Sequence, residues 1–139
     1  MNKILIILLL INLTSPSKSQ NLNQEGKPLP NLKKYNGKYP NKVRLFDDKS
    51  LNHRLTKLLQ SRYVFLRKTW GPEIPIEIKN NIFIAWGCQQ HNCSNTNFVI
   101  VVDFSKNVVY VGIREEENVK VYSEDGSINI EISKWANRN

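Results

Sequence analysis

The chain has 139 residues, 40% of them hydrophobic and 23% charged, and carries a formal net charge of +8. This length is enough for one compact domain and excludes two domains of ordinary size. The excess charge is concentrated, because residues 20–44 contain six basic residues and one acidic residue, whereas residues 45–139 contain twelve and eleven. A basic segment therefore precedes a nearly neutral folded body.

The amino terminus has the organisation of an export signal. Lys3 precedes the apolar run Ile4–Ile11, and Ser17-Lys18-Ser19 puts small residues at the two positions that a signal peptidase reads. Cleavage before Gln20 would remove residues 1–19 as a signal peptide. The apolar run is too short for a permanent anchor, and no cysteine follows it to carry a lipid. The sequence predicts a periplasmic or secreted protein without a stable membrane anchor.

Residues 20–42 form the basic segment, which is predicted to be a flexible arm. It has few apolar residues and three prolines, Pro28, Pro30 and Pro40, so it lacks the composition for a buried surface or a regular helix. Two interpretations stay open: a solvated leader, or a contact for anionic polymers and lipid head groups. Nucleic acid is not a predicted partner, because aromatic residues are sparse here and an exported protein seldom meets it.

A single domain is predicted over residues 43–139, and it begins with an amphipathic helix. Asp47 or Asp48 can cap the start of this helix. Apolar residues then recur at the spacing of one helix face, at Leu51, Leu55, Leu58 and Leu59. Three polar residues are expected to project away from that face: His53, Arg54 and Lys57. The histidine is therefore expected to be an exposed helix residue.

The pattern changes to that of strands after Trp70-Gly71-Pro72, where turn residues break the helix. Alternation at Ile74, Ile76 and Ile78, followed by Asn80-Asn81, is typical of a strand and a hairpin turn. Further strands are predicted over Ile82–Trp86, Asn97–Phe104, Val108–Ile113 and Val119–Tyr122.

Residues 127–139 can be read as a last strand, as a short end helix that contains Trp135, or as a frayed tail. The short links between the strands indicate an antiparallel meander. The predicted fold is α+β, a two-layer structure in which one main helix packs on an antiparallel sheet of about five strands, with the C-terminal helix as one alternative.

The candidate functional site is the segment between the only two cysteines, Cys88-Gln89-Gln90-His91-Asn92-Cys93. In an exported protein two such cysteines most simply oxidise to each other. Closing so short a ring contributes about 2 kcal/mol in the usual chain model, so global stability is a weak reason for the bridge. Its better use is local, because it restrains the residues that a partner would otherwise have to order on binding.

Other chemistry was considered for the same residues. A zinc site from Cys88, His91 and Cys93 would need His53 or an acid as fourth ligand, and the spacing matches no closed structural pattern. A cysteine nucleophile would be abolished by oxidation, and haem attachment requires a histidine directly after the second cysteine. A purely structural bridge beside an incidental His91 stays open. The sequence predicts no metal, no cofactor and no enzymatic activity.

The segment Trp86-Gly87 followed by Cys-x-x-His-x-Cys, within a helix-then-meander order, resembles the Ivy family of periplasmic inhibitors of vertebrate (c-type) lysozyme. The similarity covers roughly residues 39–123 and includes Tyr39-Pro40 and Gly112. In that family the disulfide-closed loop enters the substrate cleft of lysozyme, and its histidine bonds the catalytic carboxylates. The resemblance gives that role to His91, with Cys88 and Cys93 as the staple, and it implies that the chain can form a homodimer.

The loop departs from the usual family pattern, Cys-Lys-Pro-His-Asp-Cys, at Gln89, Gln90 and Asn92. One charge of each sign and a fixed backbone angle are lost. The predicted function is an exported inhibitor of c-type lysozyme or of a related muramidase or lytic transglycosylase. The alternative is a non-catalytic envelope module that binds anionic polymers or membrane surfaces through the basic arm.

Overall fold

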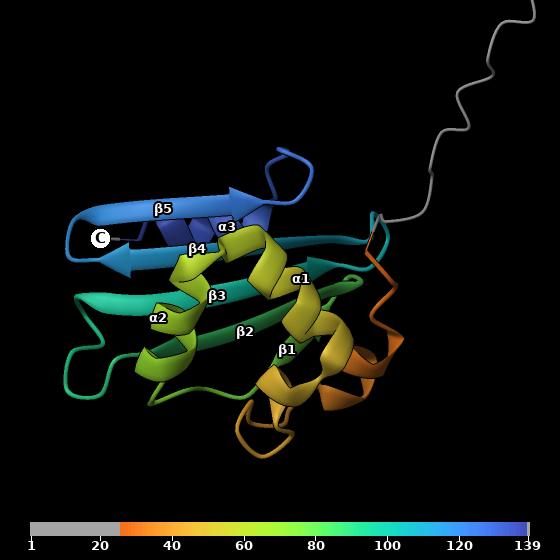
Figure 1. The fold of residues 1–139 in the computed structure, drawn as a ribbon, viewed down its shortest axis with the longest axis horizontal. Helices are drawn as coiled ribbons and strands as arrows, with labels where there is room; N and C mark the ends of the chain where they lie inside the picture. The colour runs from red at the N-terminus through yellow and green to blue at the C-terminus, as the bar shows by residue number, and fades with distance from the viewer. Residues whose placement is uncertain (1–25, 139) are drawn as a thin grey trace, which may run out of the picture.

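The computed structural model describes residues 26–138, which are built around a five-stranded antiparallel sheet with the strand order β1-β2-β3-β4-β5 (Figure 1). The strands are β1 (Glu77–Lys79), β2 (Ile82–Cys88), β3 (Thr96–Asp103), β4 (Val108–Glu115) and β5 (Asn118–Ser123). Each strand pairs with the one before it in the chain, so the predicted α+β meander is confirmed. The predicted signal peptide, residues 1–19, lies outside the described residues.

The first hairpin turns at Asn80 and Asn81, whose φ angles are 50° and 63°. Asparagine tolerates this left-handed backbone, as the sequence predicted. β1 is shorter than the isoleucine alternation suggested, because Ile74 is 54% exposed and the paired strand begins only at Glu77. Pro75 separates them and has no N–H to give to a ladder.

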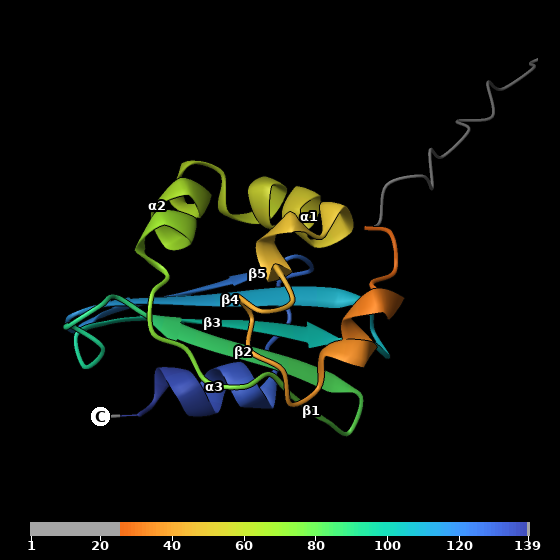
Figure 2. The same ribbon diagram turned by 90° about the horizontal axis from the view of Figure 1, so that it is seen from below.

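Two helices cover one face of the sheet, α1 (Lys49–Leu59) and α2 (Ser61–Thr69) (Figure 2). A short 3-10 helix, η2 (Leu45–Asp47), leads into α1, and the Asp48 carboxylate caps α1 by accepting from the Leu51 N–H at 2.9 Å. The main helix predicted on the sheet is present as α1, and the structure adds α2 after it, because Gln60 has a φ of 50° and ends α1 where α2 begins. The sheet-facing residues of the pair are Leu51, Leu55, Leu59, Tyr63 and Leu66.

A third helix, α3 (Ile130–Ala136), lies on the opposite face of the sheet (Figure 2). The Asn129 side chain caps it by accepting from the Glu131 N–H at 2.8 Å. Of the three alternatives for the C-terminal segment, the helix containing Trp135 is the one present. The protein therefore has three layers rather than two. The smaller core under α3 consists of Val99, Val101, Val108, Tyr110, Ile132 and Trp135.

The basic segment is part of the folded body from Gly26 onward, which corrects the expectation of a flexible arm up to residue 42. Leu29 and Leu32 are only 4% and 0% exposed and belong to the larger core. They flank the start of a 3-10 helix, η1 (Pro30–Tyr35), in which a spacing of three residues puts two side chains on one side. Burying two leucines fixes the segment although its overall apolar content is low.

The expectation that Arg54 projects into solvent with His53 was wrong, because the Arg54 side chain is buried. It is 3% exposed and pairs with the Glu124 carboxylate. Its Nε and Nη2 donate to that carboxylate. The two terminal nitrogens, Nη1 and Nη2, also donate to the main-chain carbonyl oxygens of Lys27 and Asn107 and to the side-chain oxygen of Asn107. A buried guanidinium needs this full set of acceptors, and it ties the N-terminal segment, α1 and the end of β5 together.

Candidate functional site

The Cys88–Cys93 loop connects the neighbouring strands β2 and β3 at one end of the sheet (Figure 1). The two cysteines form a disulfide, with their Cα atoms 4.9 Å apart. Cys88 is fully buried as the last residue of β2, and Cys93 is half-buried. Because both sulfurs are bonded to each other, neither is a zinc ligand or a thiol nucleophile in this state.

The tip of the loop is a tight turn with His91 at its apex. The Asn92 N–H donates to the Gln89 carbonyl at 3.0 Å, and His91 has a φ of 61°. A positive φ at the third residue of such a turn is the geometry of type II, in which histidine is tolerated better than most non-glycine residues. The side chains of Gln90 and His91 are exposed, so the turn directs the only imidazole of the loop into solvent.

The side-chain amide of Asn92 hydrogen-bonds to other residues of the loop and its flank through both its nitrogen and its oxygen. Its Nδ2 donates to Gln89 Oε1 at 2.7 Å and to Thr96 Oγ1 at 3.3 Å, and its Oδ1 accepts from Asn95 Nδ2 at 2.9 Å. Its main-chain carbonyl also accepts from the Thr96 N–H at 2.8 Å. A carboxylate at this position would have no proton to donate to Gln89. The two departures at Gln89 and Asn92 are therefore matched to each other inside the loop.

The start of the loop is fixed by the segment that follows α2. The Cys88 N–H donates to the Pro72 carbonyl at 2.9 Å, and the Gly71 N–H donates back to the Cys88 carbonyl at 2.8 Å. A Cβ atom on Gly87 would fall 2.2 Å from the Trp70 ring, so only glycine permits the close approach of indole and strand. Steric contact with Trp70 therefore explains why glycine occupies the second position of the Trp86-Gly87 pair.

A second turn lies beside the loop, between β4 and β5. The Glu116 N–H donates to the Asn95 carbonyl at 2.7 Å, and both Glu116 and Glu117 are exposed. Glu115 forms an ion pair with Arg62 of α2. Asn95 and Glu116 come to the same end of the sheet through the antiparallel order of β3, β4 and β5, so no pattern in the sequence connects this turn with the loop.

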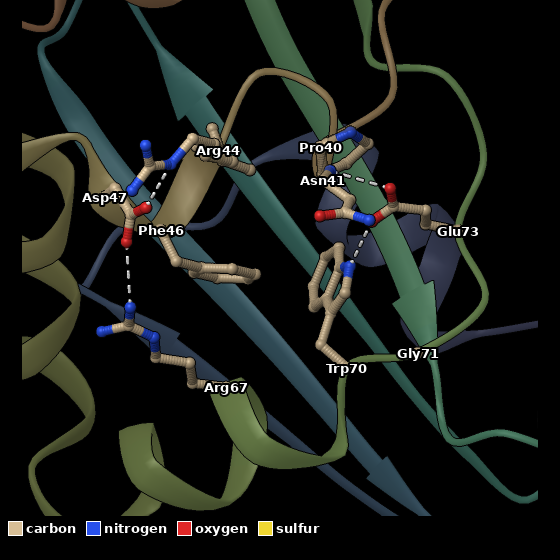
Figure 3. A pocket seen from close by; sticks show the side chains of 10 residues that line it. Pro40, Asn41, Arg44, Phe46, Asp47, Arg67, Trp70, Gly71 and Glu73 are labelled. Atoms are coloured by element: carbon tan, nitrogen blue, oxygen red, sulfur yellow. Dashed lines mark hydrogen bonds and ion pairs between the residues drawn. The ribbon is translucent and has the colours of Figure 1, made fainter.

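A hollow of about 470 Å³ borders the segment that follows α2 and holds the start of the loop (Figure 3). Phe46 and Trp70 meet edge to face in it, with ring centroids 5.1 Å apart. Asp47 accepts from Arg67 at 3.0 Å, while Glu73 accepts from the Trp70 indole N–H at 2.7 Å. These charged groups are therefore paired with neighbours inside the hollow.

A second hollow of about 450 Å³ includes His53, Lys57 and the Arg54–Glu124 pair. His53 is exposed on α1, as predicted, and it does not join the loop. Asp125 at its rim has its pKa lowered, first by the hydrogen bond from the Ser127 hydroxyl and then by the Ser127 N–H. Within residues 26–138, no group of three or more histidine, cysteine and acidic residues is placed to hold a metal ion.

None of the helices in the described part of the chain is long and apolar enough to cross a membrane. The searches of curated proteins and of solved structures gave no match. A protein-family model described as "Inhibitor of vertebrate lysozyme (Ivy)" matches residues 50–139, which is more than half of the chain. The match covers α1 from its second residue, α2, the whole sheet, the disulfide loop and α3. It begins later than the resemblance seen in the sequence, which included Tyr39-Pro40, and continues past the end of that resemblance near residue 123. The chain therefore belongs to the Ivy family, the inhibitors of vertebrate lysozyme.

Proposed function

We propose that this protein is exported and inhibits a lysozyme-type glycosidase by inserting the Cys88–Cys93 loop into the substrate cleft. The observation that carries the proposal is the exposed His91 at the apex of a disulfide-closed turn. Family membership supports lysozyme as the target class. The inhibitor undergoes no reaction, since it acts by occupying the space that the glycan chain needs.

The chemistry of such a cleft suits an imidazole. Glycosidases of this kind use one carboxylic acid as the proton donor and a second carboxylate as nucleophile or stabiliser. An imidazole carries two ring nitrogens, each able to donate when the ring is protonated, and a neighbouring carboxylate favours the protonated form. His91 can therefore bond two acidic groups at once, and no other side chain of the loop combines a compact ring with two donors.

The loop is ordered before any partner arrives. The disulfide, the Asn92–Gln89 turn bond and the Asn92 side-chain bonds restrain it from several directions. Ordering a residue costs about 1–2 kcal/mol of backbone entropy, so a preformed loop spares the complex several kcal/mol. A proline at position 90 would restrain the backbone of the turn by fixing φ. With Gln90 at this position, the disulfide and the hydrogen bonds of Asn92 supply the restraint.

The distribution of charge supports a cationic target. The loop itself has no formal charge, while Glu116 and Glu117 lie at the same end of the sheet and are exposed. At the loop end, Arg62 is paired with Glu115, and Arg114 donates to main-chain carbonyls of α3. Lys33, whose ammonium is 5.1 Å from the Phe104 ring centroid, and Lys106 in the β3–β4 turn lie at the other end. The eight residues of β3 separate the two ends by about 25 Å, beyond the screening length at physiological salt.

The direct test is inhibition by the exported form against c-type, g-type and i-type lysozymes and lytic transglycosylases. His91→Ala is compared with His53→Ala, a matched loss of an exposed histidine on α1. Losing hydrogen bonds to charged groups costs about 3 kcal/mol, which corresponds to roughly a hundredfold weaker inhibition for His91→Ala. The proposal fails if the panel is not inhibited, or if both variants inhibit as strongly as the parent.

A second candidate function is binding of anionic polymers by the basic segment. The observation that favours it is a group of exposed lysines on and around η1, namely Lys27, Lys33, Lys34, Lys38 and Lys42. Deleting the segment would remove Leu29 and Leu32 from the core, so charge removal is the better test. Replacing three of these lysines by glutamine should abolish polymer binding and leave lysozyme inhibition intact if the loop is the inhibitory site.

A further inference from the structure

The second half of the loop is held by a residue outside it, Asn97. This asparagine in β3 is 8% exposed. Its Nδ2 donates to the Cys93 carbonyl at 2.9 Å, and its Oδ1 accepts from the indole N–H of Trp135 at 3.0 Å. One side-chain amide therefore joins the disulfide loop to the C-terminal helix α3 on the far face of the sheet.

The indole that orients Asn97 is itself fixed in position. Trp135 is 6% exposed, and a Cβ atom on Gly112 would fall 2.2 Å from its ring. The Arg114 guanidinium lies 5.2 Å from the ring centroid and donates to the main-chain carbonyls of Trp135 and Ala136. The indole therefore cannot shift without repacking the underside of β4, and the direction of its N–H is set by the sheet.

We infer that α3 is a second anchor of the loop, in which Trp135 and Asn97 are positioning residues for Cys93 and hence for the His91 turn. The disulfide fixes the Cys93 sulfur, whereas Asn97 fixes the Cys93 carbonyl, so the two restraints act on different atoms of one residue. The first half of the loop is held separately through Cys88 by Gly71 and Pro72. The effect on inhibition rests on the proposed function, but the anchoring itself does not.

A simpler interpretation is that Asn97 only satisfies a buried indole N–H, since buried polar groups need partners. Any acceptor on β3 or β4 would meet that need. The geometry points further because the remaining polar end of the same amide reaches into the loop, and because the Cys93 carbonyl is bonded by no other donor among the described residues. The two interpretations differ in what happens to the loop when the indole N–H is removed.

Trp135→Phe keeps an aromatic ring on Gly112 and removes the N–H. The readout is amide hydrogen exchange in the exported protein, at Asn92, Asn95 and Thr96 in the loop and at central residues of β3 and β4. Losing a hydrogen bond worth about 1.4 kcal/mol should speed exchange in the loop roughly tenfold, with central strand amides unchanged relative to a matched control. That control is Ile132→Val, which loosens α3 packing without touching Asn97.

Asn97→Asp breaks the other link, because it keeps an acceptor for Trp135 but turns a carboxylate oxygen toward the Cys93 carbonyl. It should speed loop exchange at least as much as Trp135→Phe, and combining both changes should add nothing, since they interrupt one route. Inhibition should weaken by a similar factor in each variant. Additive effects, or faster exchange spread equally over loop and strands, would overturn the inference.

The two proposals can fail separately. Fast loop exchange in Trp135→Phe together with no inhibition by the parent protein would retain the anchor and reject the inhibitory function. Normal loop exchange with full inhibition in Trp135→Phe would reject the anchor and retain the inhibitory function. Exchange is measured on the free protein, so neither result depends on finding the target enzyme.

Discussion

Replacing both cysteines by alanine removes the covalent closure of the loop but leaves its hydrogen bonds in place. The ring spans five positions, and opening it should cost about 2 kcal/mol of unfolding free energy in the chain-entropy model. Cys88 is completely buried, so the missing sulfur leaves a small void that adds about 1 kcal/mol. The expected total of about 3 kcal/mol lowers the urea midpoint by about 2 M for a domain of this size.

The effect on inhibition should be smaller than complete loss. Asn92 still bonds Gln89 and Thr96 in the opened loop, and Asn97 still holds the Cys93 carbonyl. The target enzyme then has to supply only the ordering of about one residue, which costs about 1–2 kcal/mol and weakens binding about tenfold.

Urea unfolding and calorimetric titration with lysozyme measure the two quantities on one sample. The parent protein treated with a thiol reductant is the control, because it opens the ring without changing the buried atoms. Affinity equal to that of the parent would refute preorganisation by the disulfide. A loss of more than about 5 kcal/mol in unfolding free energy would instead show that the disulfide stabilises the whole fold, contrary to the chain-entropy estimate.

Three further changes test other parts of the account. Gly87→Ala should lower the unfolding free energy by about 1–3 kcal/mol because its methyl group overlaps the Trp70 ring, and thermal unfolding that matches the parent would show that the ring yields without cost. Replacing Glu116 and Glu117 by lysine should slow association with a basic lysozyme severalfold at low salt, as measured by stopped flow, with the difference vanishing at high salt; an unchanged rate would remove the turn from the encounter. Burial raises the pKa of Tyr63 above its ordinary value, so the neutral phenol stabilises the fold below about pH 10 and this contribution is lost as the pH rises through the raised pKa. Tyr63→Phe should therefore flatten the alkaline fall in stability, and an identical fall in the variant would assign it to other groups.

The meander was predictable because local rules decide it. Strand alternation, the Asn80-Asn81 turn and the Asp48 cap each depend on neighbours in the sequence, and all three are present. The sequence also contains an indication of the third layer. Phe98–Val102 is a continuous apolar run, which is typical of a strand buried on both faces. In the structure, the C-terminal helix α3 covers that second face.

Other features depend on contacts between distant parts of the chain. Nothing near Gln60 marks the break between α1 and α2, since no glycine or proline stands there and the left-handed backbone comes with the packing of both helices. Arg54 is buried because Glu124 and Asn107 meet it from the sheet, 70 and 53 positions away. In the candidate site, the cysteine pair and His91 followed from the sequence, but the anchors Gly71 and Asn97 followed only from the fold.

The central claim is that the loop occupies the glycan cleft of a lysozyme, and competition tests it most directly. The affinity of the protein lacking residues 1–19 for a c-type lysozyme is measured at increasing concentrations of a soluble chito-oligosaccharide that fills the same cleft. The account predicts that the apparent Kd rises in proportion to the oligosaccharide concentration, as for two ligands that exclude each other. A complex whose Kd is independent of the oligosaccharide would contradict it, because inhibitor and sugar would then bind at the same time.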